Sequence, residues 1–233
     1  SFHGAIPASL GHLRRLQWLY LDTKSFSGTL PVNLSAYICL IKMRLENNTL
    51  GGPMPAELGE KLTSLEVITL RNDSFTGPIP TSLANLSHLQ AVSLADNQLV
   101  GSIPPGLGSI QSMRYFGLFN NLLNGTFPPS IYNCSLLEAF DVGQNMFSGS
   151  IPDDIGSTFP KLRYLGTGGN HFTGSIPYSV SNMSSLVKLS LVQNNFSGYV
   201  PPMLGKLGSL QEVNLAVNKL EANDNKGWEF ITS

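Results

Sequence analysis

The sequence has little charge and no long apolar run. Charged residues make up 12% of the 233 residues and the formal net charge is −1, which leaves no basic surface of the kind that binds nucleic acid or an anionic membrane. No apolar run approaches the roughly 18 residues that a membrane-spanning helix needs, and residues 1–4 form neither a Met start nor a secretion signal. We therefore expect no nucleic-acid partner and no membrane contact by this segment, and we interpret it as an interior piece of a longer protein.

Catalytic and metal-binding patterns are also missing. The four histidines are scattered, without the H-E-x-x-H spacing or the Cys/His cluster that holds a metal. The run Gly166-x-Gly168-Gly169 is only superficially like a phosphate-binding loop, because it falls where a strand is expected. Kinase motifs such as His-Arg-Asp are absent. We therefore predict a non-catalytic segment with no cofactor and no metal.

What the sequence does contain is one unit repeated about nine times. A polar residue, usually Asn, recurs at steps of 24 or 25 residues, at Lys24, Asn48, Asp73, Asn97, Asn121, Asn145, Asn170, Asn194 and Asn218. A second series with the pattern Gly-x-Ile-Pro, or a close variant, runs in phase with it from Gly4 to Pro201. Two series in phase over this many periods indicate a repeat architecture.

Each unit predicts a short strand followed by a turn. Apolar pairs such as Val92 and Leu94 have the period of two that is typical of a half-buried strand. One unit cannot bury that face alone, so the units must stack and share a continuous core. The repeated Asn follows the strand, where its amide can satisfy backbone groups of the turning chain. Gly permits the next bend, and Pro begins a short segment that needs no further donor.

Residues 1–220 resemble the plant extracellular leucine-rich repeat, with the consensus L-x-x-L-x-x-L-x-L-x-x-N-x-L-x-G-x-I-P-x-x-L-G. The resemblance implies an α/β repeat solenoid, a horseshoe or superhelix with a parallel β-sheet on its concave face and short 3₁₀ segments on its convex face. One solenoid would then cover residues 1–233, as a partial repeat 1–12, complete repeats 13–36, 37–61, 62–85, 86–109, 110–133, 134–158, 159–182 and 183–206, and an irregular ninth repeat 207–233. In that last repeat, Trp228-x-Phe230 is similar to an interruption in receptor-like kinases that include immune receptors.

The cysteines and the asparagine sequons bear on the compartment. Cys39 and Cys134 lie four repeats apart, about 19 Å at the spacing of neighbouring strands, whereas a disulfide needs Cα atoms within about 7 Å. We therefore predict two buried free thiols. Eight Asn-x-Ser/Thr sequons favour a secreted, glycosylated chain, at Asn33, Asn47, Asn72, Asn85, Asn124, Asn133, Asn182 and Asn195.

Candidate binding residues are those that alternate with the core residues of each strand and so project from the concave face. A first cluster combines aromatic and basic side chains that can stack on a ring or pair with a ligand carboxylate, namely Trp18, Tyr20, Lys42, Arg44 and Arg71. A second cluster surrounds a floor of glycines, Gly117, Gly143, Gly166 and Gly168, with Tyr115, Phe119, Asp141 and Tyr164.

Simpler interpretations of both clusters stay open. Lys42, Arg44 and Glu46 also fit a self-neutralising solvated row, and Trp18 also fits packing against preceding repeats. The aromatic and glycine residues of the second cluster also fit ordinary sequence variation. Because glycans at Asn47 and Asn72 would shadow one margin of the first cluster, we favour the second as the ligand site.

The resemblance implies the ligand-sensing segment of a plant receptor-like serine/threonine kinase, in defence or development, at the extracellular face of the plasma membrane. It implies a peptide or protein ligand on the concave face and a leucine-rich-repeat co-receptor as partners. The alternatives are a secreted or kinase-less repeat protein that inhibits a microbial cell-wall hydrolase, and a purely structural or decayed fragment.

Overall fold

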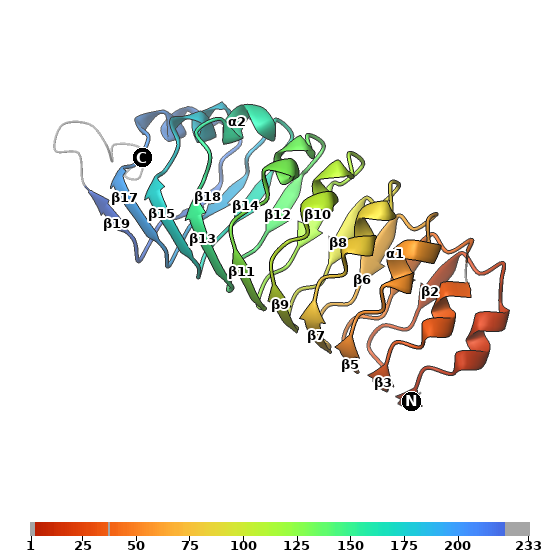
Figure 1. Cartoon of the computed structure of the whole chain (residues 1–233). Coiled ribbons are helices and arrows are strands. Elements are labelled where there is room, and N and C mark those ends of the chain that lie inside the picture. The colour runs from red at the N-terminus through yellow and green to blue at the C-terminus, as the bar shows by residue number, and fades with distance from the viewer. Residues whose placement is uncertain (1–2, 37, 222–233) are drawn as a thin grey trace.

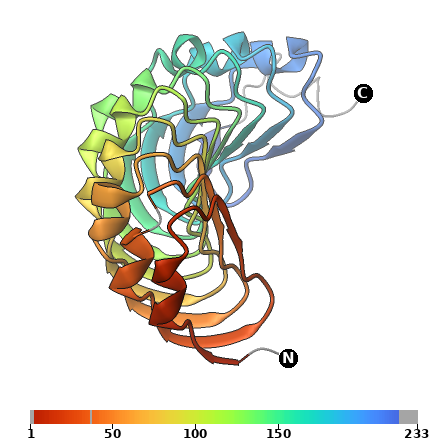
Figure 2. The ribbon, with the colours of Figure 1, turned by 90° about the vertical axis from the view of Figure 1, so that its right-hand side faces the viewer.

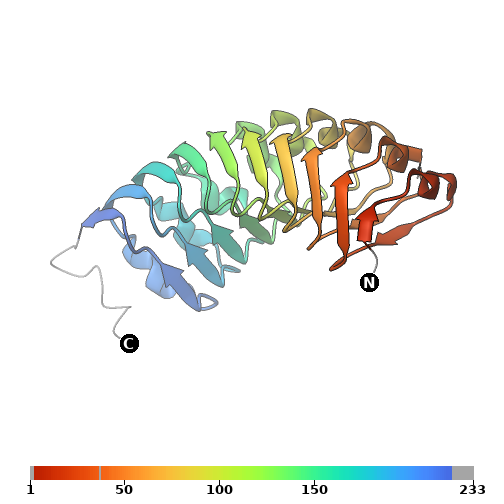
Figure 3. The ribbon, with the colours of Figure 1, turned by 90° about the horizontal axis from the view of Figure 1, so that it is seen from below.

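The chain winds into successive coils that line up side by side along an arc (Figures 1 and 2). The computed structural model describes residues 3–36 and 38–221. Each complete coil contributes one strand to each of two parallel sheets and one short helix to the outer side of the arc (Figures 2 and 3). The leucine-rich-repeat solenoid predicted from the sequence is thereby confirmed.

The nine-stranded sheet lies on the inner side of the arc and is built from the alternating apolar segments. Its strands are β2 (Trp18–Tyr20), β4 (Lys42–Arg44), β6 (Val67–Thr69), β8 (Ala91–Ser93), β10 (Tyr115–Gly117), β12 (Ala139–Asp141), β14 (Tyr164–Gly166), β16 (Lys188–Ser190) and β18 (Glu212–Asn214). The central residue of nearly every strand is buried, as with Phe116 and Phe140, while its two neighbours face outward. We call the outward side of this sheet the concave face.

A second parallel sheet, with ten strands, was not predicted. Its strands are β1 (His3–Ala5), β3 (Ser25–Thr29), β5 (Thr49–Pro53), β7 (Ser74–Pro78), β9 (Gln98–Gly101), β11 (Leu122–Gly125), β13 (Met146–Ser150), β15 (His171–Ser175), β17 (Asn195–Tyr199) and β19 (Lys219–Glu221). A buried Phe or Leu, such as Phe75, alternates here with exposed or half-buried residues, most of them polar. The Gly that we assigned to a bend lies within or at the end of every strand except β19, at positive φ, for example Gly77 at 74°.

The outer helices are mostly 3₁₀-helices that follow the Pro of the Gly-x-Ile-Pro pattern in each unit. They are η1 (Ala8–His12), η2 (Val32–Ala36), η3 (Thr81–Asn85), η4 (Pro105–Ser109), η5 (Pro129–Asn133), η6 (Tyr178–Asn182) and η7 (Pro202–Lys206), with the α-helices α1 (Glu57–Lys61) and α2 (Ile155–Thr158). The two α-helices occur in the two coils that are 25 residues long, from Asn48 to Asp73 and from Asn145 to Asn170. An α-helix rises about 1.5 Å per residue against about 2.0 Å for a 3₁₀-helix, so it can take up the extra residue without lengthening the coil.

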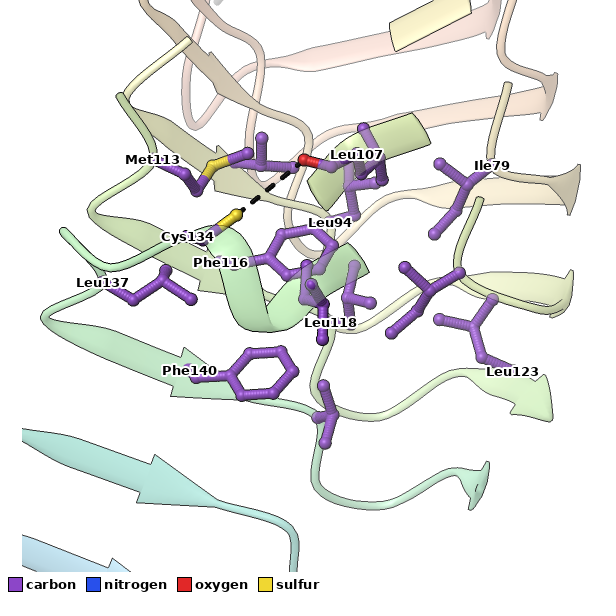
Figure 4. Close-up of a cluster of buried hydrophobic side chains, with 14 of the residues drawn as sticks. Ile79, Leu94, Leu107, Met113, Phe116, Leu118, Leu123, Cys134, Leu137 and Phe140 are labelled. Carbon is purple, nitrogen blue, oxygen red and sulfur yellow. Dashed lines mark hydrogen bonds between the residues drawn. The ribbon is translucent and has the colours of Figure 1, made fainter. Parts of the chain in front are cut away.

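One hydrophobic core runs through the coils between the two sheets and the helices. In its central part, the rings of Phe116 and Phe140 stack with centroids 5.9 Å apart, and Phe127 contacts Phe140 at 5.2 Å. Figure 4 shows Phe116 and Phe140 among aliphatic side chains from neighbouring coils. These rings lie directly behind strands β10 and β12, so the middle of the concave face rests on a densely packed base.

The repeated asparagines brace the coils as predicted. Asn97 is buried; its Oδ1 accepts from the backbone N–H of Phe75 at 2.9 Å, and its Nδ2 donates to the carbonyls of Leu70 at 2.8 Å and Leu94 at 3.1 Å. The residue before each of these positions takes a left-handed conformation, for example Asp96 at φ 55°. Backbone groups freed by this turn are thus satisfied by the amide of the next residue.

The prediction for the thiols is half right. Both cysteines are free, and Cys134 is buried, with its Sγ 3.9 Å from the carbonyl oxygen of Leu107 (Figure 4) and 3.6 Å from that of Ile110. Cys39 is exposed, contrary to our prediction, because it lies in the connection between η2 and β4 and not at a core position of the unit. The predicted Trp228-x-Phe230 interruption lies outside the described residues.

Candidate functional site

The concave face is a set of rows that cross the strands in register. One row places Tyr115, Ala139 and Tyr164 next to one another on β10, β12 and β14. The row two residues further along consists of Gly117, Asp141 and Gly166. Three residues of the predicted second cluster, Tyr115, Asp141 and Tyr164, therefore come together at the middle of the sheet. Phe119 follows β10 and lies against the next coil at Gly143; Tyr115 and Phe119 are 39% and 37% exposed. We call Tyr115, Phe119, Asp141 and Tyr164 the central cluster.

The glycines of the central cluster hold its aromatic rings. A Cβ atom at Gly117 would lie 2.7 Å from Tyr115 Oη, and one at Gly166 would lie 2.5 Å from Tyr164 Oη. Each tyrosine therefore extends along its own strand over the glycine two residues later. Phe119 leans similarly over the next coil, 3.0 Å from where a Cβ of Gly143 would be. The predicted floor of glycines is thus covered by aromatic rings at Gly117, Gly143 and Gly166, and the surface offered to a ligand is aromatic.

Asp141 lies between the two tyrosines and is held by two hydrogen bonds. Its Oδ1 accepts from the backbone N–H of Gly143 at 3.1 Å, and its Oδ2 accepts from the hydroxyl of Tyr164 at 3.2 Å. On the far side of Tyr164, the Nζ of Lys188 lies 5.6 Å from the centre of the ring, and it is paired with Glu212 at 2.8 Å. The carboxylate therefore has a fixed orientation.

Burial shifts the ionisation of these groups. It raises the pKa of Asp141, and the hydrogen bonds from Gly143 and Tyr164 act in the opposite direction. The pKa of Tyr115 and that of Tyr164 are also raised, first by burial and then by the nearby charge of Asp141. Both phenols therefore stay protonated as hydrogen-bond donors, which suits a binding surface better than acid–base chemistry.

The first predicted cluster is largely neutralised by its own neighbours. Arg44 pairs with Asp22 at 3.3 Å and with Glu46 at 2.9 Å, and its guanidinium lies 5.5 Å from the ring centre of Tyr20. Arg71 pairs with Asp96 at 2.9 Å. The guanidinium groups of this cluster are therefore engaged within the protein. Trp18 is 59% exposed and lies beside Lys42 in register, on β2 at the end of the described sheet.

Sequence reasoning missed two neighbours of the central cluster. Lys188 lies opposite Tyr164 in register, and Ser93 lies opposite Gly117 and hydrogen bonds to Tyr115. Both follow from adding or subtracting one repeat length along a row of the concave face. The alternation of the strands already predicts that both side chains project from the concave face, but we had not used the register of the sheet to find the neighbours of the second cluster.

Neither a metal cluster nor a membrane-spanning helix occurs among the residues that the structure describes. Residues 3–36 and 38–221 contain no cluster of three or more His, Cys, Asp or Glu side chains able to hold a metal. Within the same residues, no helix is both long and apolar enough to cross a membrane.

Comparisons with known proteins agree with the repeat unit. The profile of the Leucine Rich Repeat family matches residues 88–110 and 185–207. Receptor-like protein 31 of Arabidopsis thaliana is 34% identical over 71 residues, which are 30% of this chain and 8% of that protein. The chain thus spans a small part of this curated relative.

Solved structures match over almost the whole chain. The Arabidopsis receptor kinase HAESA, solved with the peptide hormone IDA and the co-receptor SERK1, superposes with a TM-score of 0.68 at 32% identity, over 94% of this chain and 44% of HAESA. A plant ice-binding protein superposes with a TM-score of 0.84 at 30% identity, over 94% of this chain and 70% of that one.

Proposed function

This chain belongs to the leucine-rich repeat proteins, and from that premise we propose that it is the ligand-binding segment of a plant receptor whose concave face binds a peptide. The segment itself is not an enzyme, since it matches Receptor-like protein 31 and the part of HAESA that is built of leucine-rich repeats, which are non-catalytic. The observation that carries the proposal is the central cluster, which exposes aromatic side chains at the middle of the concave sheet. Such rings provide large contact areas at little entropic cost, as at other recognition surfaces.

The wider protein is part of the same proposal. HAESA acts as a receptor kinase with a peptide hormone and a co-receptor, according to its solved complex. We propose the same arrangement here, with a kinase and a membrane anchor encoded outside this sequence and with the segment on the outer side of the plasma membrane. The proposed biological role is defence or development, and the Trp228-x-Phe230 resemblance favours the immune receptors among these kinases.

We also propose that glycans decorate this segment and leave the central cluster open. Seven of the eight sequon asparagines are exposed, while Asn195 is half-buried in β17. Asn33, Asn85, Asn133 and Asn182 lie in the outer helices. Asn47 and Asn72 flank the first coils, where the Nδ2 of Asn72 donates to Asn47 Oδ1 at 2.9 Å. Enzymatic deglycosylation of the secreted protein, followed by mass spectrometry, identifies the occupied positions.

The test of peptide binding compares the two sides of the arc. The purified chain is screened on an array of random 12-residue peptides, and the strongest binders are measured by calorimetry. We expect Tyr115→Ala and Phe119→Ala each to lower the affinity about tenfold or more, as for an interface aromatic. Tyr178→Ala is the matched control, because Tyr178 is 70% exposed in η6 on the outer side. Equal losses for Tyr178→Ala, or none for the concave variants, would remove the central cluster from the site.

A second candidate function is favoured by the match to the ice-binding protein and by the outward side of the ten-stranded sheet. Many of its exposed positions carry a hydroxyl group, as in Ser25, Ser27 and Thr29 of β3. Apolar residues interrupt this surface at Val100 and Leu122, which pair in register. Inhibition of ice recrystallisation by the purified chain would support this candidate, and normal ice growth at micromolar protein would exclude it.

A further inference from the structure

The acidic residues at the outward-facing positions of the concave face, in or just after its strands, differ in whether a basic side chain neutralises them. Three of them form ion pairs: Asp22 and Glu46 with Arg44, and Glu212 with Lys188. Among the residues that the structure describes, Asp141 has no basic group within ion-pair distance. It is also the one closest to the middle of the sheet, between the two tyrosines. The charges of Lys188 and Arg71 act on Asp141 from a greater distance. A partly buried carboxylate with no cation in direct contact is complementary to a cationic group of a ligand.

The hydrogen bonds of Asp141 leave room for such a group. Each carboxylate oxygen can accept about two hydrogen bonds, and Asp141 receives one on each oxygen, from Gly143 and from Tyr164. One acceptor position on each oxygen therefore remains. The two existing bonds fix the carboxylate, so a ligand meets it in a prearranged orientation.

The surroundings of the carboxylate suit the apolar part of a cationic side chain. In the row beside Asp141, the methyl group of Ala139 separates Tyr115 from Tyr164, whose Cα atoms are thus two strand spacings apart, about 10 Å. Lys188 already lies near the ring of Tyr164. Tyr115 makes no such contact with a cation among the described residues and is 39% exposed. The exposed ring of Tyr115 can therefore bind a cationic group of a ligand, or the aliphatic stem of the side chain that carries it.

We propose that Asp141, Tyr115 and Tyr164 form a pocket for an arginine or lysine side chain of the bound peptide. The cationic group pairs with the free acceptor positions of Asp141, and the stem or guanidinium plane packs against the ring of Tyr115, which lies over Gly117 in the same row as Asp141. This inference rests on the proposed peptide-binding function and specifies which peptides the concave face selects. Gly117 and Gly166 are part of the pocket, since any side chain there would displace the tyrosine rings.

The test uses the complete chain and the array of random 12-residue peptides. We expect the bound peptides to be enriched in Arg or Lys at one fixed position, and Asp141→Asn to lose this enrichment. For one selected peptide, we expect Asp141→Asn, or replacement of its arginine by citrulline, to weaken binding about 10- to 100-fold, which is the range for a hydrogen bond to a charged group. Where lysine is selected, its acetylated form replaces citrulline. Thermal unfolding verifies that each variant is folded.

Controls separate this inference from the proposed function. Asp154→Asn makes the same chemical change at an exposed residue at the start of α2, and it should leave binding unchanged. Tyr115→Phe should retain most of the affinity and Tyr115→Ala should not, because the ring is what contacts the ligand. Peptides that bind the concave face without Arg or Lys enrichment, or with equal affinity for Asp141→Asn, would refute the cationic pocket and leave peptide binding intact. If no peptide binds, both are refuted.

Discussion

Asp73 stands where most coils have a buried asparagine, and its replacement by Asn should stabilise the protein in a pH-dependent manner. Asp73 Oδ1 accepts from the backbone N–H of Leu50 at 2.9 Å, but its Oδ2 is buried without a hydrogen-bond partner. In the next coil, the Nδ2 of Asn97 instead donates to the carbonyls of Leu70 and Leu94. Burial raises the pKa of Asp73 to about 7, against the opposing hydrogen bonds from the backbone.

The sign and size of the effect follow from this pKa. Because the folded-state pKa lies above the ordinary value of 3.8, the fold favours the protonated carboxyl, and stability is lost as the pH rises from about 4 through about 7. A difference of this size corresponds to about 4 kcal/mol for a fully buried group. Asp73 is only partly removed from water, so screening reduces the penalty to about 1–2 kcal/mol above pH 7. At about 2–4 °C per kcal/mol for a chain of this length, Asp73→Asn should raise the Tm at pH 8 by about 2–8 °C.

Thermal unfolding of the chain and of Asp73→Asn, followed by circular dichroism between pH 4 and pH 8, measures this difference. The gain in Tm should be largest at pH 8 and should shrink towards pH 4, where Asp73 is protonated. Asp153→Asn, at an exposed acidic residue before α2, is the control and should show neither effect. A gain in Tm that does not depend on pH would show that the hydrogen bonds of the new side-chain amide stabilise the protein and that the carboxyl charge does not affect its stability. No gain at pH 8 would refute the reasoning altogether.

Three further predictions concern the core and the thiols. An aromatic disulfide reagent should modify only Cys39 in the folded protein and Cys134 only after denaturation, because Cys134 is buried and burial raises its pKa to about 11; two fast-reacting thiols in the native state would contradict the described packing. Phe140→Ala should destabilise the protein by about 3–5 kcal/mol in urea titration, since Phe140 stacks on Phe116 in the core; a loss below 1 kcal/mol would mean that the core collapses around the cavity. Gly108→Ala should destabilise more than an ordinary surface substitution, because its Cβ would lie 2.0 Å from the carbonyl oxygen of Ser130, and an unchanged Tm would show that neighbouring coils can separate there.

The concave sheet could be predicted from the sequence, and the second sheet could not, for a physical reason. Pairs such as Val92 and Leu94 repeat the strand pattern clearly, and a core needs them to stack. In β7, by contrast, a single buried residue, Phe75, stands among Ser74, Thr76 and Gly77, and a Gly at positive φ is more often the mark of a bend. Only the stacking of successive coils turns these short segments into a ladder.

The residues of the central cluster could be predicted from the sequence, but the orientation of their aromatic rings could not. Register alone places Tyr115, Asp141 and Tyr164 together. Which way a tyrosine ring lies depends on the room beside it, and Gly117 and Gly166 provide that room. Residue spacing does not determine side-chain rotamers. We therefore predicted that the glycines form the floor of the site, whereas the tyrosine rings lie over Gly117 and Gly166. Cys39 was misjudged for another reason: it occupies the position of Ser64 and His88 in the next two coils, which is exposed, and we had not compared it with them.

The two α-helices on the outer side indicate where this architecture tolerates changes in length. The hydrogen bonds by which the asparagine side chains join the coils connect residues 22 to 28 positions apart, such as Phe75 with Asn97. One residue added near a strand would therefore shift these hydrogen bonds out of register. At α1 and α2, the smaller rise per residue of an α-helix accommodates one extra residue, and the strands on either side keep their register. A peptide tag or a spectroscopic reporter is therefore best inserted at the exposed end of α1. Elsewhere, we expect the fold to tolerate insertions and deletions only when they add or remove a whole coil.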